Sequence, residues 1–324
     1  MKALVTGATG FVGSHLLEAL RQHGHAARAM VRFPAKAAAL GIADVEWAEG
    51  DLRDEAALHR ACEGMDLVFH VAGVIAARSE DEYFAVNRDG TERLLRAAQA
   101  AGARFVLVSS LAAAGPTTPG RPLIGGEPAR PVTPYGRSKL AAEEVVRGAP
   151  AQMPWTIIRP PTVYGPRDRE MLRVFRAAAL GLAPVFGDGS QELSLIYAPD
   201  LALALIAAGI QTSTIGKTYF AAHSEIVTAR QLVGRIGAAM DRRVRVVPVP
   251  STLARIILHV TGAVARLADR PTVLSPDKAD EFLQPAWTCD PGSLERDTGW
   301  RAEHDLDSGA RATTDWYRRR GWLS

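Results

Sequence analysis

Short apolar runs alternate with longer amphipathic stretches through the first half of the chain. Because the short runs are apolar throughout, we expect them to form a parallel sheet that is buried on both faces. The predicted strands cover residues 3–5, 27–31, 45–48, 67–71, 105–109 and 155–159. The predicted helices are one that ends near residue 23 and two over residues 80–101 and 134–147. This strand–helix–strand order predicts an α/β fold with a Rossmann-type, doubly wound parallel sheet.

The second half of the chain has a different pattern. After Gly165, proline and glycine become frequent, and helical stretches at residues 169–179, 200–208 and 229–240 stand between irregular segments. We therefore expect a first domain over residues 1–165 and a smaller lobe over residues 166–324, which returns some of its elements to the main sheet.

One stretch of the second half combines apolar and charged residues. Over residues 251–268, apolar side chains recur at helical spacing, at Leu253, Ile256, Ile257, Val260, Val264 and Leu267. Arg255, His259 and Arg266 interrupt them, so we do not expect the stretch to span a membrane. We favour a helix that packs over a substrate pocket, and the alternative is a helix that lies on a bilayer surface.

Composition narrows the classes of partner. The 324 residues are 47% hydrophobic and 23% charged, which is enough to bury a large core. Lys plus Arg number 38 against 35 Asp plus Glu, and the basic residues are scattered, so we expect a small-molecule substrate and no nucleic acid. Cys62 and Cys289 are too few for a disulfide framework and lack metal-ligand spacing, so we expect no metal and a cytoplasmic location. The N-terminus enters an apolar strand directly and leaves no room for a signal peptide.

A glycine-rich motif follows the first predicted strand and opens the first helix. Its residues are Thr6, Gly7, Ala8, Thr9, Gly10, Phe11, Val12 and Gly13. We expect Gly7 to allow a tight turn, Gly10 to let a pyrophosphate approach the helix N-terminus, and Gly13 to let helix and strand pack closely. Between a strand and a helix, this motif predicts a dinucleotide site.

The end of the second predicted strand carries a cation where an acidic residue would bind the ribose of NAD. Arg32, with Lys36 nearby, can hold a 2′-phosphate, so we predict that NADP(H) is preferred and NAD(H) is the alternative. A solvated surface arginine is the other interpretation of Arg32. Asp51 is a candidate acceptor for the adenine amino group. His70 has no acid or nucleophile beside it, so we interpret it as a packed strand-end histidine.

Tyr135 and Lys139 are a candidate catalytic pair at the start of a helix, with Thr133 as its expected N-cap. Residues four apart share one helix face. A free tyrosine has a pKa of about 10, and an adjacent ammonium lowers it. Ser110, at the end of the strand over residues 105–109, can hydrogen-bond a substrate oxygen beside Tyr135.

Together these motifs resemble the extended branch of the short-chain dehydrogenase/reductase superfamily over nearly the whole chain. The matching segments, in family order, are residues 6–13, Asp51 and Leu52, residues 70–73, Asn87, Gly90 and Thr91, Ser109 and Ser110, residues 135–139 and residues 159–166. The resemblance implies that Ser110, Tyr135 and Lys139 form the active site, that Asn87 supports the cofactor region, and that Pro160 to Val163 line the nicotinamide. It also implies that the chain forms a homodimer through the helices that contain Glu92 and Glu143.

The motifs and the resemblance together give one set of expected cofactor-binding residues. It comprises Thr6, Gly7, Thr9, Gly10, Phe11, Val12, Gly13, Arg32, Lys36, Asp51, Leu52, Val71, Ala72, Gly73, Asn87, Ser109, Tyr135, Lys139, Pro160, Thr162 and Val163.

Departures from the family pattern narrow the chemistry. Sugar 4,6-dehydratases place an Asp-Glu pair after the active hydroxyl, whereas Leu111 and Ala112 follow Ser110 here. Many nucleotide-sugar epimerases carry an arginine for the diphosphate where this chain has residues 192–194, with the sequence Glu-Leu-Ser. Arg167, Arg169 and Arg173 are a candidate replacement anion site.

Three functions follow from these observations. The first is an NADP(H)-dependent reductase or dehydrogenase for ketones, aldehydes or secondary alcohols, similar to flavonoid-reductase-like or hydroxysteroid-dehydrogenase-like members, and the apolar residues 74–77 favour it. The second is a nucleotide-sugar epimerase, and the third is a cofactor-sensing protein without catalysis. We expect substrate specificity to depend on residues 75–83, 115–127 and 166–194.

Overall fold

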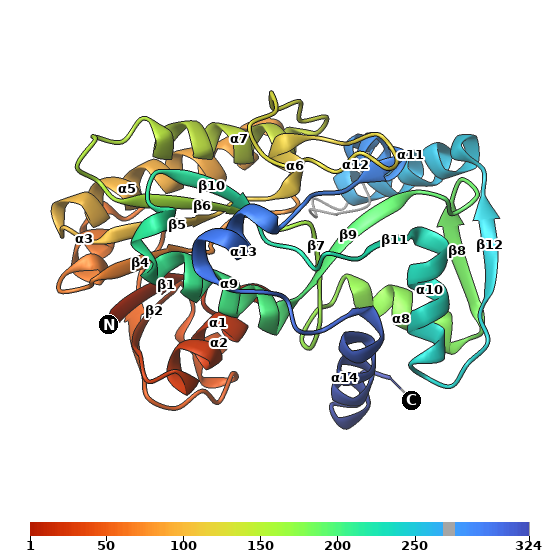
Figure 1. Ribbon diagram of the computed structural model, residues 1–324, viewed down its shortest axis with the longest axis horizontal. Coiled ribbons are helices and arrows are strands. Elements are labelled where there is room, and N and C mark those ends of the chain that lie inside the picture. Colours follow the sequence, from red (N-terminus) through yellow and green to blue (C-terminus); the bar gives the residue numbers. More distant parts are fainter. Residues whose placement is uncertain (268–275, 324) are drawn as a thin grey trace.

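The computed structural model describes residues 1–267 and 276–323, and a seven-stranded sheet forms one half of the molecule (Figure 1). The strand order is β10-β6-β5-β4-β1-β2-β3, and every neighbouring pair is parallel. The bounds are β1 Lys2–Thr6, β2 Ala26–Val31, β3 Val45–Glu49, β4 Leu67–His70, β5 Arg104–Val108, β6 Trp155–Arg159 and β10 Lys217–Phe220. The predicted α/β fold with a Rossmann-type parallel sheet is confirmed.

Helices cover both faces of this sheet because successive strand residues point to opposite sides. On β5, Val106 and Val108 belong to a core cluster with α1 and α9, whereas Phe105 and Leu107 belong to one with α3, α5 and α7. The helix bounds are α1 Phe11–Gln22, α2 Pro34–Ala38, α3 Glu55–Cys62, α5 Gly90–Ala100, α6 Leu111–Ala114, α7 Pro134–Arg147 and α9 Ala198–Ile210. Residues beyond position 165 thus supply a strand, β10, and a covering helix, α9, to the main sheet.

The other half of the molecule is built from small sheets and helices (Figure 1). Strand β9 (Glu192–Tyr197) pairs with β7 (Thr162–Tyr164), β11 (Ile226–Thr228) and β13 (Ala286–Trp287), and β8 (Leu182–Phe186) pairs with β12 (Arg245–Val249). The remaining elements are α8 Met171–Ala179, α10 Ala229–Ala238, α11 Ser251–Leu267, α12 Pro276–Phe282, α13 Gly292–Thr298, α14 Leu306–Arg319 and the short 3₁₀ turn η2 Thr212–Thr214.

The prediction of one continuous helix over residues 80–101 is wrong, because the helix is interrupted. It is divided into α4 (Glu80–Phe84), a π-helical turn η1 (Ala85–Asp89) and α5. Such turns often occur at functional sites, and this one contains the buried Asn87.

The apolar stripe predicted to pack over a pocket forms α11, but most of it faces outward. Leu253, Ile256, Ile257 and Val260 are 45–60% exposed, whereas Ala254 and Leu258 are buried. Ala268 and the side chains of Val264, Arg266 and Leu267 lie outside the described residues. Within the described part of the chain, no helix combines the length and the apolar character that crossing a bilayer requires.

Candidate active site

The glycine loop connects β1 to α1 at the carboxyl edge of the sheet. Gly7 has φ +68°, and a Cβ there would lie 2.6 Å from the backbone nitrogen of Ala72. A Cβ on Gly13 would lie 2.3 Å from the Gly7 carbonyl oxygen. Gly10 is the N-cap of α1 and supplies no side-chain cap, which leaves the first-turn amides for an anion. This loop fits a dinucleotide pyrophosphate.

His70 is a packed histidine, as the sequence analysis interpreted it. Its Nδ1 lies 2.7 Å from Thr6 Oγ1, and its Nε2 lies 2.9 Å from Thr91 Oγ1. Burial and the charge of Lys139 lower the pKa of His70 to about 3, so the ring is neutral at physiological pH. The Thr6 hydroxyl also accepts from the Ala72 amide at 3.3 Å, so it joins β1 to the loop after β4.

Two cations stand at the end of β2. The Arg32 guanidinium carbon lies 5.8 Å and the Lys36 ammonium 5.3 Å from the centre of the Phe33 ring, which is itself 55% exposed. Asp51 follows β3 nearby, and its pKa is lowered mainly by the hydrogen bond from the Arg53 side chain. Leu52 is a core residue, against which Gly90 of α5 packs closely. The carboxyl edge of β2 and β3 therefore presents positive charge.

Helix α7 carries the candidate catalytic pair. Thr133 caps it by accepting from the Gly136 amide at 3.1 Å, and Pro134 occupies its first turn, as the sequence predicts. Ser110 is the N-cap of α6, directly after β5. The Ser110 and Tyr135 side chains are hydrogen-bonded to each other, so the fold brings these two predicted residues together.

The electrostatics of Tyr135 differ from the expectation. Burial raises the pKa of Tyr135 to about 12, the hydrogen bond with Ser110 lowers it, and the negative charge of Glu281 raises it further. Lys139 is not among the groups that lower this pKa. The predicted lowering by the lysine is therefore wrong for the protein alone, and the phenol is protonated at neutral pH.

Lys139 is 5% exposed and donates to the carbonyl oxygen of Val108 at 2.7 Å. Burial lowers the pKa of Lys139 to about 8, against a smaller raising effect of Glu143. A Cβ built on Gly73 would lie 3.8 Å from the Lys139 ammonium, so the loop after β4 passes close to the lysine. Because glycine has no side chain, Gly73 leaves the space beside the Lys139 ammonium open.

Asn87 connects three parts of the site. Its Oδ1 accepts from the Val74 amide at 2.9 Å, and its Nδ2 donates to the Val74 carbonyl at 3.1 Å and to Ser138 Oγ at 2.9 Å. It thereby holds residues 71–74, which include the predicted contacts Val71, Ala72 and Gly73, against α7. The supporting role predicted for Asn87 rests on these contacts.

Ser109 points away from the expected cofactor region. Its hydroxyl donates to Glu143 at 2.6 Å, and Arg159 holds the same carboxylate through two bonds of 2.8 and 2.6 Å. Arg147 adds a bond of 2.7 Å. From the sequence, Glu143 was predicted only to lie on a dimer helix. The buried network was missed, because its members come from separate elements and belong to no common motif.

The segment after β6 returns beside Ser110. Pro160 accepts from the Leu111 amide at 2.8 Å, and Thr162 and Val163 form half-buried β7 next to β9. This position is compatible with the predicted role of Pro160, Thr162 and Val163 at the nicotinamide.

The surroundings of Tyr135 are largely apolar. It packs on a cluster that includes Leu111, Phe220 and Trp287, and Leu193 packs on the same cluster. The Tyr83 ring centre lies 6.2 Å from that of Tyr135, and Glu281 of α12 is the carboxylate that acts on its pKa. The sequence analysis missed Trp287 and Glu281, because β13 and α12 reach the site only through the tertiary fold.

The proposed replacement anion site is wrong. Arg167 binds Ser14 and Glu18 of α1, the Arg169 guanidinium lies 5.2 Å from the centre of the Trp322 ring, and Arg173 pairs with Glu170 at 3.5 Å. Each arginine has a different neighbour, so the three do not converge.

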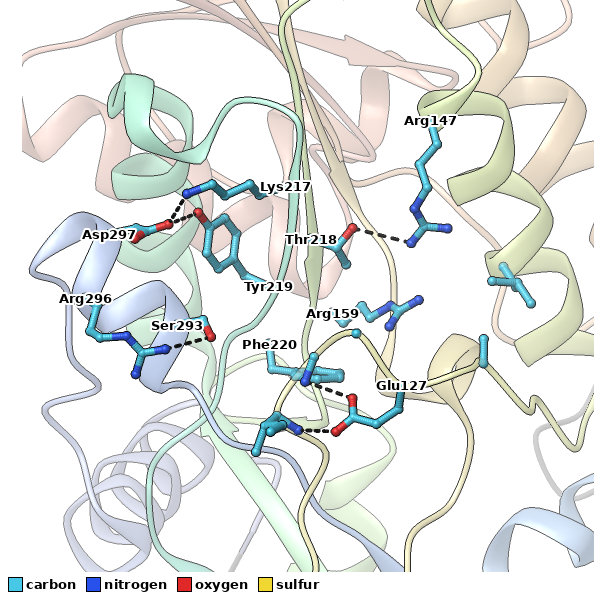
Figure 2. A pocket seen from close by; sticks show the side chains of 15 residues that line it. Glu127, Arg147, Arg159, Lys217, Thr218, Tyr219, Phe220, Ser293, Arg296 and Asp297 are labelled. Carbon is cyan, nitrogen blue, oxygen red and sulfur yellow. Dashed lines mark hydrogen bonds and ion pairs between the residues drawn. The ribbon is translucent and has the colours of Figure 1, made fainter.

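A cavity of about 630 Å³ opens at the β10 edge of the sheet, and its lining excludes Tyr135 and Lys139 (Figure 2). Its carboxylates already have partners. Glu127 accepts from the Ile124 and Gly125 amides at 2.8 and 2.9 Å, and Asp297 binds Lys217 and Tyr219. We therefore place the reaction at the Tyr135 end of α7 and not in this cavity.

Comparisons with known proteins show the family and the fold of the chain. Residues 3–220 match the model of the NAD dependent epimerase/dehydratase family. The chain is 34% identical to a ceramide reductase of Caulobacter vibrioides over 98% of this chain and 95% of that protein. It is 30% identical to a 2-alkyl-3-oxoalkanoate reductase of Stenotrophomonas maltophilia over 96% and 98% of the two chains. The solved structure of MoeE5 in complex with UDP-glucose and NAD superposes with a TM-score of 0.79 at 25% identity, covering 99% of each chain.

Three observations agree: the glycine loop packs against the end of β4, Tyr135 and Lys139 share one face of α7, and residues 3–220 match the family model. The chain belongs to the NAD dependent epimerase/dehydratase family and is an NAD(P)-dependent oxidoreductase.

Proposed function

We propose that this chain is an NADP(H)-dependent reductase of a ketone or aldehyde on a molecule with a long aliphatic part, and that it also catalyses the reverse oxidation. The hydrogen-bonded pair of Ser110 and Tyr135, with Lys139 one turn further along α7, carries the proposal. When bound, the nicotinamide cofactor supplies the hydride to the carbonyl carbon.

The chain's own residues manage the proton. Tyr135 is protonated at neutral pH, so it can donate its proton to the carbonyl oxygen as that oxygen gains charge. The Ser110 hydroxyl holds the same oxygen in place. Lys139, one turn from Tyr135 and fixed by the Val108 carbonyl, would hold the ribose of the bound cofactor. The products are an alcohol and the oxidised cofactor.

Two observations support an apolar substrate. Tyr135 packs on an apolar cluster that includes Leu111 and Trp287, which favours a hydrocarbon chain over a charged group beside it. The two relatives are named for ceramide and for 2-alkyl-3-oxoalkanoates, and both compounds carry long alkyl chains. The divergence of Arg167, Arg169 and Arg173 removes the observation that favoured a nucleotide sugar.

Changing Tyr135 to Phe tests the catalytic role. We expect turnover with a long-chain ketone to fall by at least about 100-fold, while NADPH binding stays normal, because only the proton donor is lost. Stopped-flow absorbance at the NADPH band measures the turnover, and fluorescence titration measures NADPH binding. A hydride-transfer rate close to that of the unchanged enzyme would refute the role.

The cofactor preference has its own test. We expect Arg32→Ser to lower the ratio of kcat/KM with NADPH to kcat/KM with NADH by about tenfold, because a charged hydrogen bond to the 2′-phosphate is lost. Arg60→Ser, on the exposed side of α3, is the control and should leave the ratio unchanged. An unchanged ratio in Arg32→Ser, or better catalysis with NADH in the original enzyme, would overturn the preference.

We further propose that residues 1–165 bind the dinucleotide and that residues 166–324 bind the substrate. Homodimer formation through α5 and α7, and a cytoplasmic location, stay predictions.

A further inference from the structure

Helix α11 has two apolar faces, and only one of them is covered. Ala254 and Leu258, one turn apart, are buried at 0% and 1% exposure, and α11 packs against α12. Leu253, Ile256, Ile257 and Val260 follow at i, i+3, i+4 and i+7 and are 47%, 60%, 45% and 57% exposed. At 3.6 residues per turn these four side chains fall within an arc of about 100°, so they form one continuous stripe. We call these four residues the α11 stripe.

The same end of the molecule exposes further apolar side chains. Figure 1 shows β8, β12 and α11 together at the end opposite β1–β3, and α11 begins two residues after β12 ends. Leu182 on β8 is 51% exposed and Val247 on β12 is 40% exposed. Leu182 is paired with Arg245, and Val247 lies two residues further along β12, so they share one face of this small sheet. Seven of the twelve large apolar side chains that the described residues expose lie on β8, β12 or α11 or within two residues of these elements: Leu180, Leu182, Val247, Leu253, Ile256, Ile257 and Val260.

The charge near the α11 stripe is mostly positive, with Asp280 of α12 as an acidic neighbour. From residue 242 to residue 268 the sequence contains five arginines and neither aspartate nor glutamate. Arg242, Arg243 and Arg245 are exposed, and Arg255 is half-exposed beside Asp280 at 3.3 Å. Exposed apolar side chains close in the chain to exposed arginines favour binding to an anionic lipid surface, because hydrocarbon burial and attraction to the headgroups act together.

We propose that the α11 stripe, with Arg242, Arg243 and Arg245, docks this protein on the surface of a bilayer that contains anionic lipids. This docking stands apart from the hydride transfer proposed above, since it needs neither cofactor nor substrate. Docking would also explain why the stripe faces outward. Helix α11 packs against α12, and Glu281 of α12 acts on the pKa of Tyr135, so the docked face lies near the active site. A long-chain substrate dissolved in the bilayer would thus meet the enzyme close to its active site.

Vesicle sedimentation of the full chain, without cofactor or substrate, tests the proposal. We expect the protein to sediment with vesicles of phosphatidylcholine and phosphatidylglycerol and much less with phosphatidylcholine alone. The double variant Ile256→Asp/Val260→Asp should bind the anionic vesicles at least about tenfold more weakly. Ile210→Asp is the matched control, because Ile210 is 47% exposed at the end of α9, outside the α11 stripe, and this variant should bind normally.

A second variant keeps the α11 stripe intact. Arg242→Gln/Arg243→Gln/Arg245→Gln changes only exposed side chains, and it should lose most of the preference for anionic over neutral vesicles. Reduction of a short, water-soluble ketone should stay unchanged in both sets of variants, which shows that the active site is folded.

Three results would overturn the proposal. The first is that the unchanged protein stays in the supernatant with anionic vesicles. The second is that the stripe variant and the Ile210→Asp control bind equally well. The third comes from sedimentation velocity: if the stripe variant converts a dimer to a monomer and the unchanged dimer does not bind vesicles, the stripe is an interface between two copies of the chain.

Discussion

Lys139 and Glu143 lie one turn apart on α7 and both are buried, but the protein surrounds their charges in opposite ways. Glu143 is completely buried and accepts hydrogen bonds from Ser109, Arg147 and Arg159. Lys139 donates to a single neutral carbonyl, and burial lowers its pKa to about 8. The turn of α7 that carries Glu143 therefore fixes the ends of β5 and β6. The preceding turn carries Lys139, a buried cation whose charge is only weakly compensated.

A substitution of Glu143, whose charge is compensated, should give the largest loss of stability. Glu143→Gln leaves the Arg159 guanidinium buried without its carboxylate, so we expect the free energy of unfolding to fall by about 3–5 kcal/mol. Denaturant unfolding at neutral pH measures this. Glu92→Gln is the control, because Glu92 pairs with Arg96 on the exposed face of α5 and should cost less than about 0.5 kcal/mol. Equal losses in the two variants would contradict the anchoring role of Glu143.

The weakly compensated turn should affect catalysis more than stability. Lys139→Met removes the cation proposed to hold the cofactor ribose, and we expect kcat/KM to fall by about 100-fold. Because a buried cation is also removed, the free energy of unfolding at pH 7 should stay the same or rise. The comparison between the two turns would fail if Lys139→Met destabilised the protein as strongly as Glu143→Gln.

The pH dependence of stability gives a smaller and finer test. Folding lowers the pKa of Lys139 from 10.5 to about 8, so the unfolded chain binds more protons between these two values. The stability of the unchanged protein relative to Lys139→Met should therefore rise with pH across this window, by about 3 kcal/mol. Below the window the cost of burying the ammonium is present in full. Parallel urea titrations of both proteins measure the difference, and a constant difference would mean that Lys139 is well solvated.

Much of the fold could be predicted from local signals. The helix predicted over residues 134–147 agrees with α7 at both ends, because Thr133 caps it and Pro134 fits the first turn. The predicted strands agree with β1–β6 within one or two residues, since apolar runs between turn residues are short-range features. The paired strands β8 and β12 were missed, because Pro184 and Pro248 interrupt their apolar runs, and a proline within such a run argues against a strand.

The candidate site was predictable in part, and the reason is again the range of the interactions. Gly7, Gly13 and the Tyr135–Lys139 spacing belong to motifs, and the fold places them at one edge of the sheet. The direction of the Tyr135 pKa shift was predicted wrongly, because burial exceeds the effects of nearby groups and burial is not written in a motif.

By itself, the amino-acid sequence determined the parallel sheet, the glycine loop and the family resemblance, because each depends on residues that are neighbours along the chain or on fixed motifs. Only the tertiary structure decided that Glu281 and Trp287 reach Tyr135, that Glu143 is enclosed by two arginines, and that the α11 stripe faces outward. These features arise from contacts between residues far apart in the sequence, and burial and charge pairing exist only once those contacts have formed.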